Sequence, residues 1–332
     1  MSEDLTTATP RRIIIDTDPG VDDALAILLA FAAPNLTVEG LTIACGNGKD
    51  ITKLGANANF LARAAGFAGV PVCLGDASLD EAEAAQEVPV HVHGEDGLGD
   101  MAQQMGRIDA DFAGFHPSSA AQFIVDTCTA SPGEITIVAI APLSNVAAAL
   151  ALCPALPQLA RELVIMGGAV HGELRGNRTA AAEANFAADP EAAQRVMTAS
   201  FRSIVLADLG VTHQTDICAL REACMREAPD STITKLIYAV SECYVDCYLK
   251  TFRQPSAPAH DVVAVMFLIR PELFSKRPAR VEVELTGTLT RGMSVVDWNG
   301  RWKRATNCEV LMTVMDTEQF TAAFAAAMRC LP

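Results

Sequence analysis

A cluster of four aspartates at one strand-to-helix turn constrains this chain more than any other part of its sequence. The cluster occupies eight consecutive positions and consists of Asp16, Asp18, Asp22 and Asp23. It follows the run Ile13–Ile15 and precedes an apolar run from Ala24 to Ala33, so we expect a buried strand before it and a buried helix after it. In open α/β sheets such turns form ligand sites. Two charges roughly 4 Å apart repel by about 4 kcal/mol at an effective dielectric of about 20, so the cluster predicts a bound divalent cation.

The charge balance narrows the class of partner. The chain has 332 residues, with 25 Lys and Arg against 40 Asp and Glu, which gives a net charge of −15. This acidity argues against nucleic acid and anionic membranes as partners and favours a small neutral or cationic ligand, or a metal. Its longest apolar run has ten residues, whereas a membrane span needs about 20. Met1–Pro10 lacks the features of a secretory signal, and ten cysteines without tight pairing are typical of reduced thiols. We therefore expect a cytoplasmic protein.

Strand-like and helix-like segments alternate in units of about 30 residues, which is the rhythm of βαβ units and a parallel sheet. The expected strands are Ile13–Ile15, Val38–Ala44, Val70–Leu74, Glu134–Ile140, Leu163–Met166 and Ser203–Ala207. Later segments predict helices at Ile233–Leu249, Val262–Ile269 and Glu318–Met328, a strand near Val310–Val314, and an antiparallel hairpin formed by Val281–Leu285 and Leu289–Val296.

The expected architecture is a single α/β domain over residues 1–332, with residues 1–11 as a flexible tail. Its sheet is open, mostly parallel and Rossmann-like, flanked by helices, with extra C-terminal helices and a small antiparallel hairpin. The segment 76–116 breaks this rhythm, and a loop of this length is usually functional or mobile. The order and motion of segments 76–116 and 244–259 are not predicted.

Polar residues recur just after the expected strands, where parallel strands would bring them to one edge of the sheet. Besides the aspartate cluster they are Asn47, Asn177, Glu183, Asn185 and Asp208, joined by His260-Asp261 at the start of a late helix. Oxygen ligands predominate over paired His or Cys, which favours Ca²⁺ or Mg²⁺ over zinc. No phosphate-binding loop, dinucleotide fingerprint or serine elbow occurs, so water activated by a metal and a carboxylate is the expected nucleophile.

Several of these residues also have a purely structural interpretation. Asp22 and Asp23 would stabilise a helix N-terminus, and Asn47 would suit a turn. Glu183 and Asn185 could be solvated loop residues, and Asp16 could support the turn without binding a ligand. We expect structural or surface roles for His116, His171 and His213, whereas the roles of His91 and His93 stay open.

Taken in order along nearly the whole chain, these residues closely resemble the inosine-uridine-preferring nucleoside hydrolases. The resemblance is carried by 13-IIIDTDPGVDDA-24, Gly46-Asn47, His93-Gly94-Glu95, 142-PLSN-145, Met166-Gly167-Gly168, Asn177, 183-EANF-186, 189-DPEAA-193, Thr212-His213-Gln214, His260-Asp261 and 285-LTG-287 through Gly292-Met293. Segments 76–90 and 244–259 differ from the family pattern and would face the base, so the preferred base stays open.

The resemblance implies a calcium-dependent enzyme that splits ribonucleosides into base and ribose through an oxocarbenium-like transition state. Asp18, Asp23, Asp261 and the backbone carbonyl of Ile140 would hold Ca²⁺, and Asp18 would deprotonate a calcium-bound water. His260 would protonate the departing base. The family also implies a homodimer or homotetramer.

The resemblance further implies which residues bind the substrate. Asp22, Asn185 and Asp261 would bind the ribose 2′ and 3′ hydroxyls, Glu183 and Asn177 the 5′ hydroxyl, Met166 the underside of the sugar, Asn47 its side, and His93 would line the loop over the site. Because such a site clamps each ribose hydroxyl, the substrates would be ribonucleosides.

Two other functions fit parts of the pattern. Asp16-x-Asp18 after a strand mimics the nucleophile motif of haloacid-dehalogenase-like, Mg²⁺-dependent phosphohydrolases, with Asp16 as nucleophile, although no phosphate-gripping Lys stands in context. The same residues could also form a non-catalytic ribonucleoside-binding protein.

Overall fold

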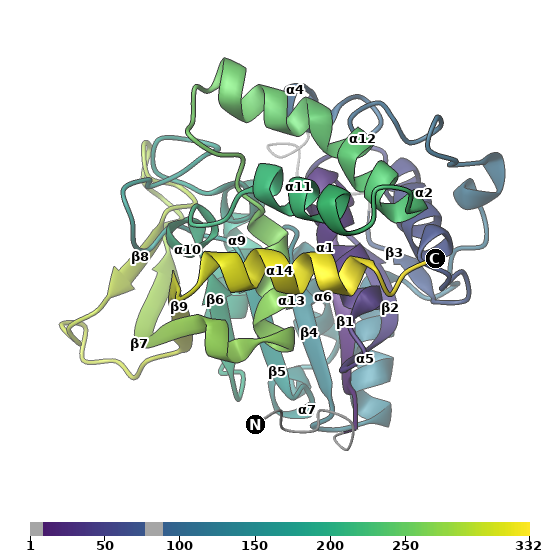
Figure 1. Ribbon diagram of the computed structural model, residues 1–332. Helices are drawn as coiled ribbons and strands as arrows, with labels where there is room; N and C mark the ends of the chain where they lie inside the picture. The colour runs from purple at the N-terminus through teal and green to yellow at the C-terminus, as the bar shows by residue number, and fades with distance from the viewer. Residues whose placement is uncertain (1–8, 77–88) are drawn as a thin grey trace.

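Within residues 9–76 and 89–332, which this computed structural model describes, nine strands form one open sheet (Figure 1). They are β1 (Arg11–Thr17), β2 (Leu36–Ile43), β3 (Val72–Leu74), β4 (Ile135–Ala139), β5 (Glu162–Met166), β6 (Ile204–Ala207), β7 (Phe274–Val283), β8 (Ser294–Asp297) and β9 (Cys308–Val314). Their order is β3-β2-β1-β4-β5-β6-β9-β7-β8, and the pairings are parallel except those of β7 with β9 and with β8. The predicted fold class, an open and mostly parallel sheet with an antiparallel addition near the C-terminus, is confirmed.

The sequence of β1 explains why the sheet is covered on both faces. Ile13 and Ile15 belong to one hydrophobic core, whereas Ile14 belongs to a second core on the opposite face. All three side chains are fully buried. Alternate residues of a strand point to opposite faces, so a run of β-branched residues needs a helical layer on each side.

Two helical layers meet this need. The layer on the side of Ile13 and Ile15 contains α1 (Val21–Ala32), α2 (Ile51–Ala64), α11 (Ile217–Glu227), α12 (Thr232–Asp246), α13 (His260–Ile269) and α14 (Thr317–Met328). The opposite layer contains α5 (Ala120–Ala130), α6 (Ser144–Leu152), α7 (Leu156–Leu159) and α9 (Pro190–Met197). Shorter helical pieces are α4 (Val90–His93), α8 (Ala184–Ala188), α10 (Leu209–Thr212), η1 (Asp109–Phe112), η2 (Cys247–Thr251) and η3 (Pro271–Leu273). No helix in the described ranges combines the length and apolarity that crossing a membrane requires.

Helix α1 lies at the centre of its layer, and each of its residues is buried. It packs against α13, α12, α2 and α14. The turn that carries the aspartate cluster is therefore enclosed by elements that are far apart in the sequence.

The start of the sheet differs from the predicted tail of residues 1–11. Strand β1 begins at Arg11, whose backbone N–H donates to Asn35 O at 2.8 Å and whose guanidinium pairs with Glu162 at 3.1 Å. These contacts fix the chain earlier than its polar composition indicated; residues 1–8 lie outside the described part. In the irregular segment 76–116, residues 77–88 also lie outside it, and the rest carries α4 and η1.

The antiparallel hairpin is present, but its second arm is shorter than predicted. We expected Leu289–Val296, whereas β8 begins at Ser294. Residues 284–293 instead form a turn closed by Gly292 N–H donating to Glu284 O at 2.7 Å, and Leu289 is 86% exposed. Its apolar side chain faces solvent and so mimicked a strand pattern in the sequence.

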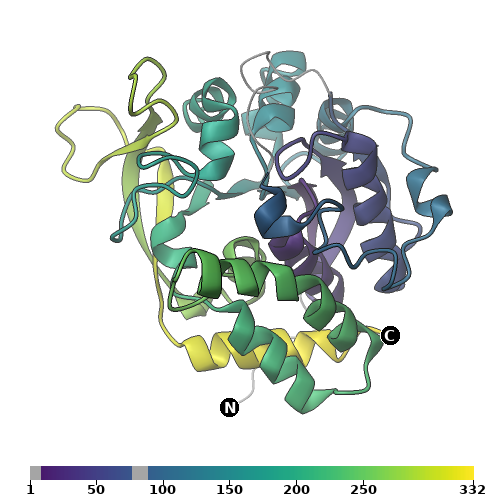
Figure 2. The same cartoon turned by 90° about the horizontal axis from the view of Figure 1, so that it is seen from above.

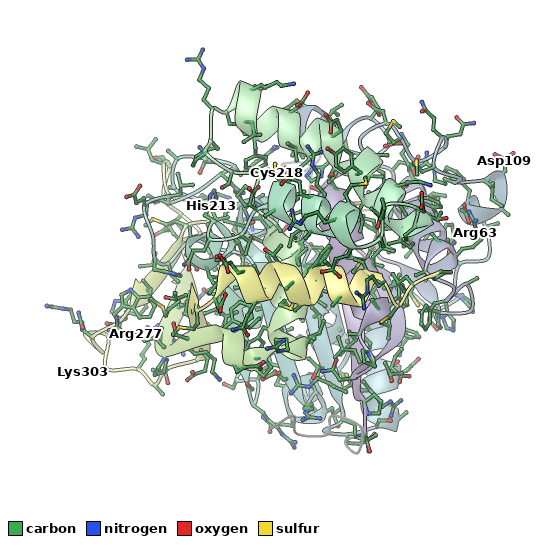
Figure 3. All side chains as sticks on the ribbon, in the orientation of Figure 1. Arg63, Asp109, His213, Cys218, Arg277 and Lys303 are labelled. Carbon is green, nitrogen blue, oxygen red and sulfur yellow. The ribbon has the colours of Figure 1, made fainter. Side chains whose placement is uncertain are left out.

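Strand β7 is longer than the predicted arm because it has a second partner. It pairs with β8 on one edge and with β9 on the other. The strands β7 and β8 and their loops project from one end of the sheet (Figures 1 and 2). Arg277 and Lys303 lie at this end, far from Arg63 and Asp109 at the opposite side (Figure 3).

A histidine–aspartate pair connects the segments that follow β5 and β6 to strand β9. His171 Nδ1 lies 2.8 Å from Asp208 Oδ1, and His171 Nε2 lies 3.0 Å from Met312 O. A carboxylate and a carbonyl both accept hydrogen bonds, so the ring meets both partners only when both nitrogens carry a proton. Burial lowers the pKa of His171, but the hydrogen bond and charge of Asp208 outweigh this and leave that pKa raised. The structural role expected for His171 is confirmed.

This pair predicts a pH dependence of stability. A raised folded-state pKa stabilises the protein below the unfolded pKa of about 6.5, and that stabilisation is lost as pH rises through the folded pKa. We therefore expect wild type to be more stable than His171→Gln in weak acid, with the difference shrinking as the pH becomes alkaline. Urea midpoints across the pH range would measure this, and a difference that stays constant would contradict it.

Candidate active site

The strand order reverses between β1 and β4, and a cavity opens at the carboxyl ends of these strands, the edge viewed in Figure 2. Ligands in open α/β sheets bind at this switch point. The cavity has a volume of about 540 Å³. The predicted site residues that line it are Asp18, Asp22, Asn47, His93, Ile140, Met166, Asn177, Glu183, Asn185, His260 and Asp261.

Asp23 lies just behind the cavity wall and organises the turn. Its carboxylate accepts from the Thr17 hydroxyl at 2.6 Å and from Asn47 Nδ2 at 3.0 Å. It also accepts from the backbone N–H groups of Asp18 at 3.2 Å and Gly20 at 3.0 Å. Burial raises the pKa of Asp23, and these hydrogen bonds oppose the rise. The strand, the turn and the start of α1 are thus tied to one carboxylate.

Asp18 is fixed by the loop that follows β2. Its Oδ2 accepts from Asn47 N–H at 2.6 Å, while Asn47 Nδ2 lies 3.2 Å from Asp18 O. A Cβ at Gly46 would lie 2.1 Å from Asp18 Oδ2, so only glycine allows this approach. Asn47 therefore shapes the turn as well as lining the cavity.

Four buried carboxylates meet at this wall, and three could hold a metal ion. Oxygens of Asp22, Asp23 and Asp261 lie within 4.8 Å of one another. Burial raises the pKa of Asp18, Asp22 and Asp261 well above the usual range, and the charges of their acidic neighbours raise it further. An all-oxygen donor set of this kind suits a hard cation, which would relieve both the burial and the repulsion.

Asp16 stands apart from this group. Its Oδ1 accepts from Thr42 Oγ1 at 2.6 Å and from Asn145 Nδ2 at 2.8 Å, and the residue is fully buried. Burial raises its pKa to about 7. Asp16 does not line the cavity. It supports the turn, as one of the two interpretations of the sequence expected.

The opposite wall is built on the N-terminus of α8. Glu183 caps this helix, and its carboxylate accepts from the N–H groups of Asn185 at 2.9 Å, Phe186 at 3.1 Å and Gly168 at 2.9 Å. It is 2% exposed, and burial raises its pKa to about 7. Glu183 is thus no solvated loop residue.

Asn185 and Asn177 are held beside Glu183. Asn185 Nδ2 lies 3.2 Å from Ile140 O and 3.1 Å from Met166 O, which leaves its side-chain carbonyl to accept from a ligand. Asn177 Oδ1 accepts from Ala184 N–H at 2.9 Å. The ends of β4 and β5 are connected to α8 through these amides.

Two buried histidines close the cavity above the acids. His260 begins α13; its Nδ1 lies 2.8 Å from Thr212 Oγ1 and its Nε2 lies 3.1 Å from the Tyr248 hydroxyl. Burial and neighbouring histidines lower the pKa of His260 well below its usual value. His93 Nδ1 accepts from Val21 N–H at 3.1 Å, and burial lowers its pKa to about 3.

Sequence reasoning placed the segment 244–259 toward the base but named none of the residues that form the upper wall. Tyr244, Tyr248 and Phe252 line the cavity at helical spacing; the two tyrosine rings stack at 4.7 Å, and Tyr248 meets Phe252 at 5.4 Å. His91, whose role was left open, also lines the cavity, with its ring 5.8 Å from Phe252. The repeat of aromatic residues every fourth position was the available signal.

His213 corrects an expectation. We predicted a structural or surface role, but its ring lies 5.4 Å from that of His260 and lines the cavity. His213 directly follows α10, whose last residue is Thr212. For His116, whose Nδ1 accepts from Ser118 N–H, the structural role is confirmed.

Comparison with known proteins decides the family. The family model for inosine-uridine preferring nucleoside hydrolases matches residues 13–322. The chain belongs to this family. It is 33% identical to the inosine-uridine preferring nucleoside hydrolase of Crithidia fasciculata, over 94% of this chain and 95% of that one. It is 35% identical to the non-specific ribonucleoside hydrolase RihC of Escherichia coli, over 90% and 92% respectively.

Solved structures of nucleoside hydrolases also resemble this chain. A plant nucleoside hydrolase superposes with a TM-score of 0.86 and 30% identity, covering 96% of this chain and 99% of that one. A purine-preferring ribonucleoside hydrolase of Gardnerella vaginalis gives 0.84 and 26%, covering 96% and 98%. This nucleoside hydrolase is thus neither a haloacid-dehalogenase-like enzyme nor a non-catalytic binding protein. The burial of Asp16 agrees, because a nucleophile must reach the cavity.

The acid group predicts a metal-dependent stability. A ligand that binds only the folded state at 100 times its Kd adds about 2.7 kcal/mol. We expect CaCl₂ to raise the melting temperature of the wild-type nucleoside hydrolase, and Asp261→Asn to abolish most of this rise.

Asp16→Asn is the matched control, since it neutralises a buried aspartate of the same turn outside the group. It should keep the calcium-dependent rise. A wild-type melting temperature that does not respond to Ca²⁺, Mg²⁺ or Mn²⁺ would contradict a metal site here.

Proposed function

We propose that this nucleoside hydrolase uses calcium and the cavity at the β1–β4 switch point to hydrolyse the N-glycosidic bond of ribonucleosides. The observation that carries the proposal is the placement of buried carboxylates on one wall and of His260, paired with the Tyr248 hydroxyl, on another. Cleavage of this bond develops positive charge on the sugar and negative charge on the base. Acids near the sugar and a proton donor near the base stabilise both.

The proposed metal ligands are Asp18, Asp23, Asp261 and the carbonyl of Ile140. When bound, calcium would neutralise the acid cluster and lower the pKa of water in contact with it. The proposal is supported by the all-oxygen donor set and by the repulsion that leaves these acids unfavourable without a cation. Asp22 lies close enough to be an alternative ligand, so the assignment of acids between ion and sugar is open to test.

Asp18 is the proposed general base. Its carboxylate lines the cavity, and its Oδ2 is held by Asn47 N–H. Burial and the charge of Asp23 raise its pKa, which strengthens it as a proton acceptor once it is ionised. It would take the proton of the attacking water while the bond to the base breaks.

The ribose would be bound by groups on two walls. Asp22, Asn185 and Asp261 are assigned to the 2′ and 3′ hydroxyls, Glu183 and Asn177 to the 5′ hydroxyl, Met166 to the underside of the sugar and Asn47 to its side. Backbone hydrogen bonds hold Glu183 and Asn177, and the side-chain amide of Asn185 is held by two carbonyls. Such fixed partners lower the entropy cost of orienting the sugar.

The departing base would be protonated by His260, assisted by Tyr248. The two polar groups are 3.1 Å apart, and Thr212 fixes the other ring nitrogen. The aromatic wall and His93 would contact the base. Since relatives include purine-preferring and non-specific enzymes, the base preference is a question for a substrate panel measured as kcat/KM.

We further propose that residues 1–332 act as one domain with ribonucleosides as its partners. Assembly into a homodimer or homotetramer and a cytoplasmic location stay predictions, to be checked by light scattering and by fractionation.

Asp18→Asn tests the base assignment. Loss of a general base removes about 10²–10⁴-fold in rate, so kcat on inosine should fall by this order. The isosteric amide should leave the melting temperature in the absence of metal unchanged or higher, because it removes a buried charge. Near-normal kcat would exclude Asp18 as the base.

His260→Ala tests the leaving-group role. The variant should lose far more activity on inosine than on a nitrophenyl riboside, since nitrophenolate leaves without a proton. Single-turnover rates on both substrates would measure this. Equal losses on the two would mean that His260 acts elsewhere in the reaction.

A further inference from the structure

The segment that follows β5 is held by an unbroken series of hydrogen bonds. Each backbone N–H of residues 167–171 donates a hydrogen bond to an acceptor outside β5. The acceptors are Ala207 O for Gly167, Glu183 Oε2 for Gly168, Ser294 Oγ for Ala169, and Asp208 Oδ2 for both Val170 and His171. The position of Glu183 is thus coupled to that of β8 through two adjacent residues.

The hydrogen bond that Ser294 accepts in this series is buried. Its Oγ lies 2.7 Å from Ala169 N, and the two residues are 3% and 2% exposed. Water cannot readily replace the hydroxyl there. Loss of the hydroxyl would leave a buried N–H without an acceptor, and such groups are costly enough to shift the backbone.

The turn before Ser294 contacts α8, the helix whose backbone N–H groups also bind the Glu183 carboxylate. Gly292 has a φ of +82°, and a Cβ there would lie 3.0 Å from Ala187 Cα and 3.3 Å from Phe186 O. The turn therefore packs on the backbone of α8. Arg291 holds it in place through two hydrogen bonds of 2.7 Å to Glu191 at the start of α9.

The hairpin thus contacts both elements that orient Glu183. One is the segment after β5, through Gly168 N–H, and the other is α8, through Phe186 N–H; both donate to Glu183 Oε2, at 2.9 and 3.1 Å. None of the described residues that line the cavity comes from β7, β8 or the turn between them. The hairpin can affect substrate only through these neighbours.

We propose that the β7–β8 hairpin, through Ser294, sets the position of Glu183 and so the fit of the ribose 5′ end. Ser294 is a positioning residue, and the inference rests on the proposed role of Glu183 toward the 5′ hydroxyl. Displacing a fixed binding group by a fraction of an ångström weakens a hydrogen bond whose strength depends steeply on geometry.

The test compares inosine with 5′-deoxyinosine, which lacks the group that Glu183 would bind. Ser294→Ala should lower kcat/KM on inosine by roughly tenfold, mainly through KM. It should change kcat/KM on 5′-deoxyinosine little, because no 5′ hydroxyl is there to be misplaced. Ser294→Thr, which keeps the hydroxyl, should restore most of the activity on inosine.

The matched control is Ser203→Ala. Ser203 also makes one side-chain hydrogen bond, to Glu162 Oε1 at 3.0 Å, but at the opposite end of β5. The Ser203→Ala variant should have the wild-type kcat/KM on both substrates. Arg291→Gln loosens the same hairpin without removing the buried hydroxyl, and should repeat the selective loss if Ser294→Ala fails to fold.

The outcomes separate the two proposals. If the wild-type kcat/KM is the same on inosine and 5′-deoxyinosine, the role given to Glu183 is wrong and the inference fails with it. If wild type prefers inosine but Ser294→Ala and Arg291→Gln lose activity equally on both substrates, Glu183 keeps its role and the hairpin's positioning role is overturned. A loss of activity in these variants that is confined to inosine supports both the role of Glu183 and the positioning role of the hairpin.

Discussion

The confinement of buried carboxylates at the end of β1 is the constraint on which the rest of the site depends. Three of these acids are within 4.8 Å of one another, and burial opposes the ionisation of each. The turn withstands this because Asp23 receives four hydrogen bonds from strand, turn and neighbouring loop. The remaining acids are left with fewer protein donors and are the ones that face the cavity. Asp23 thus anchors the turn besides being a proposed metal ligand, while Asp18, Asp22 and Asp261 line the cavity.

The topology brings distant parts of the chain to this turn. Strand order reverses between β1 and β4, so Ile140 and Asp18 end side by side. Helix α13 packs against α1 and delivers His260 and Asp261 from late in the chain. Each wall is made by a different segment, but each is anchored to the same parallel sheet. The site is therefore built from segments that are distant in the sequence but anchored to one sheet.

Local patterns in the sequence predicted the strand–turn–helix at Asp16–Asp23 and the parallel sheet. They succeeded because β-branched runs and strand-end acids report on nearby backbone. The family resemblance added the order of the remaining site residues, nine of which line one cavity together with Asp18 and Asp22. Long-range pairing was beyond local patterns: nothing near Arg11 indicates its bond to Asn35, and nothing near β7 indicates β9 as its partner. The position of His213 beside His260 likewise arises from tertiary packing.

Strand β9 has a consequence for how the chain reaches this structure. It is the last strand in the sequence, but it lies between β6 and β7, parallel to one and antiparallel to the other. During synthesis, both neighbours emerge from the ribosome before residues 308–314, the segment that pairs with their edges in the folded structure. Unpaired apolar edges attract other strands. Truncation before β9 would therefore remove an interior strand of the sheet, and a nascent chain paused at that point would expose the edges of both β6 and β7.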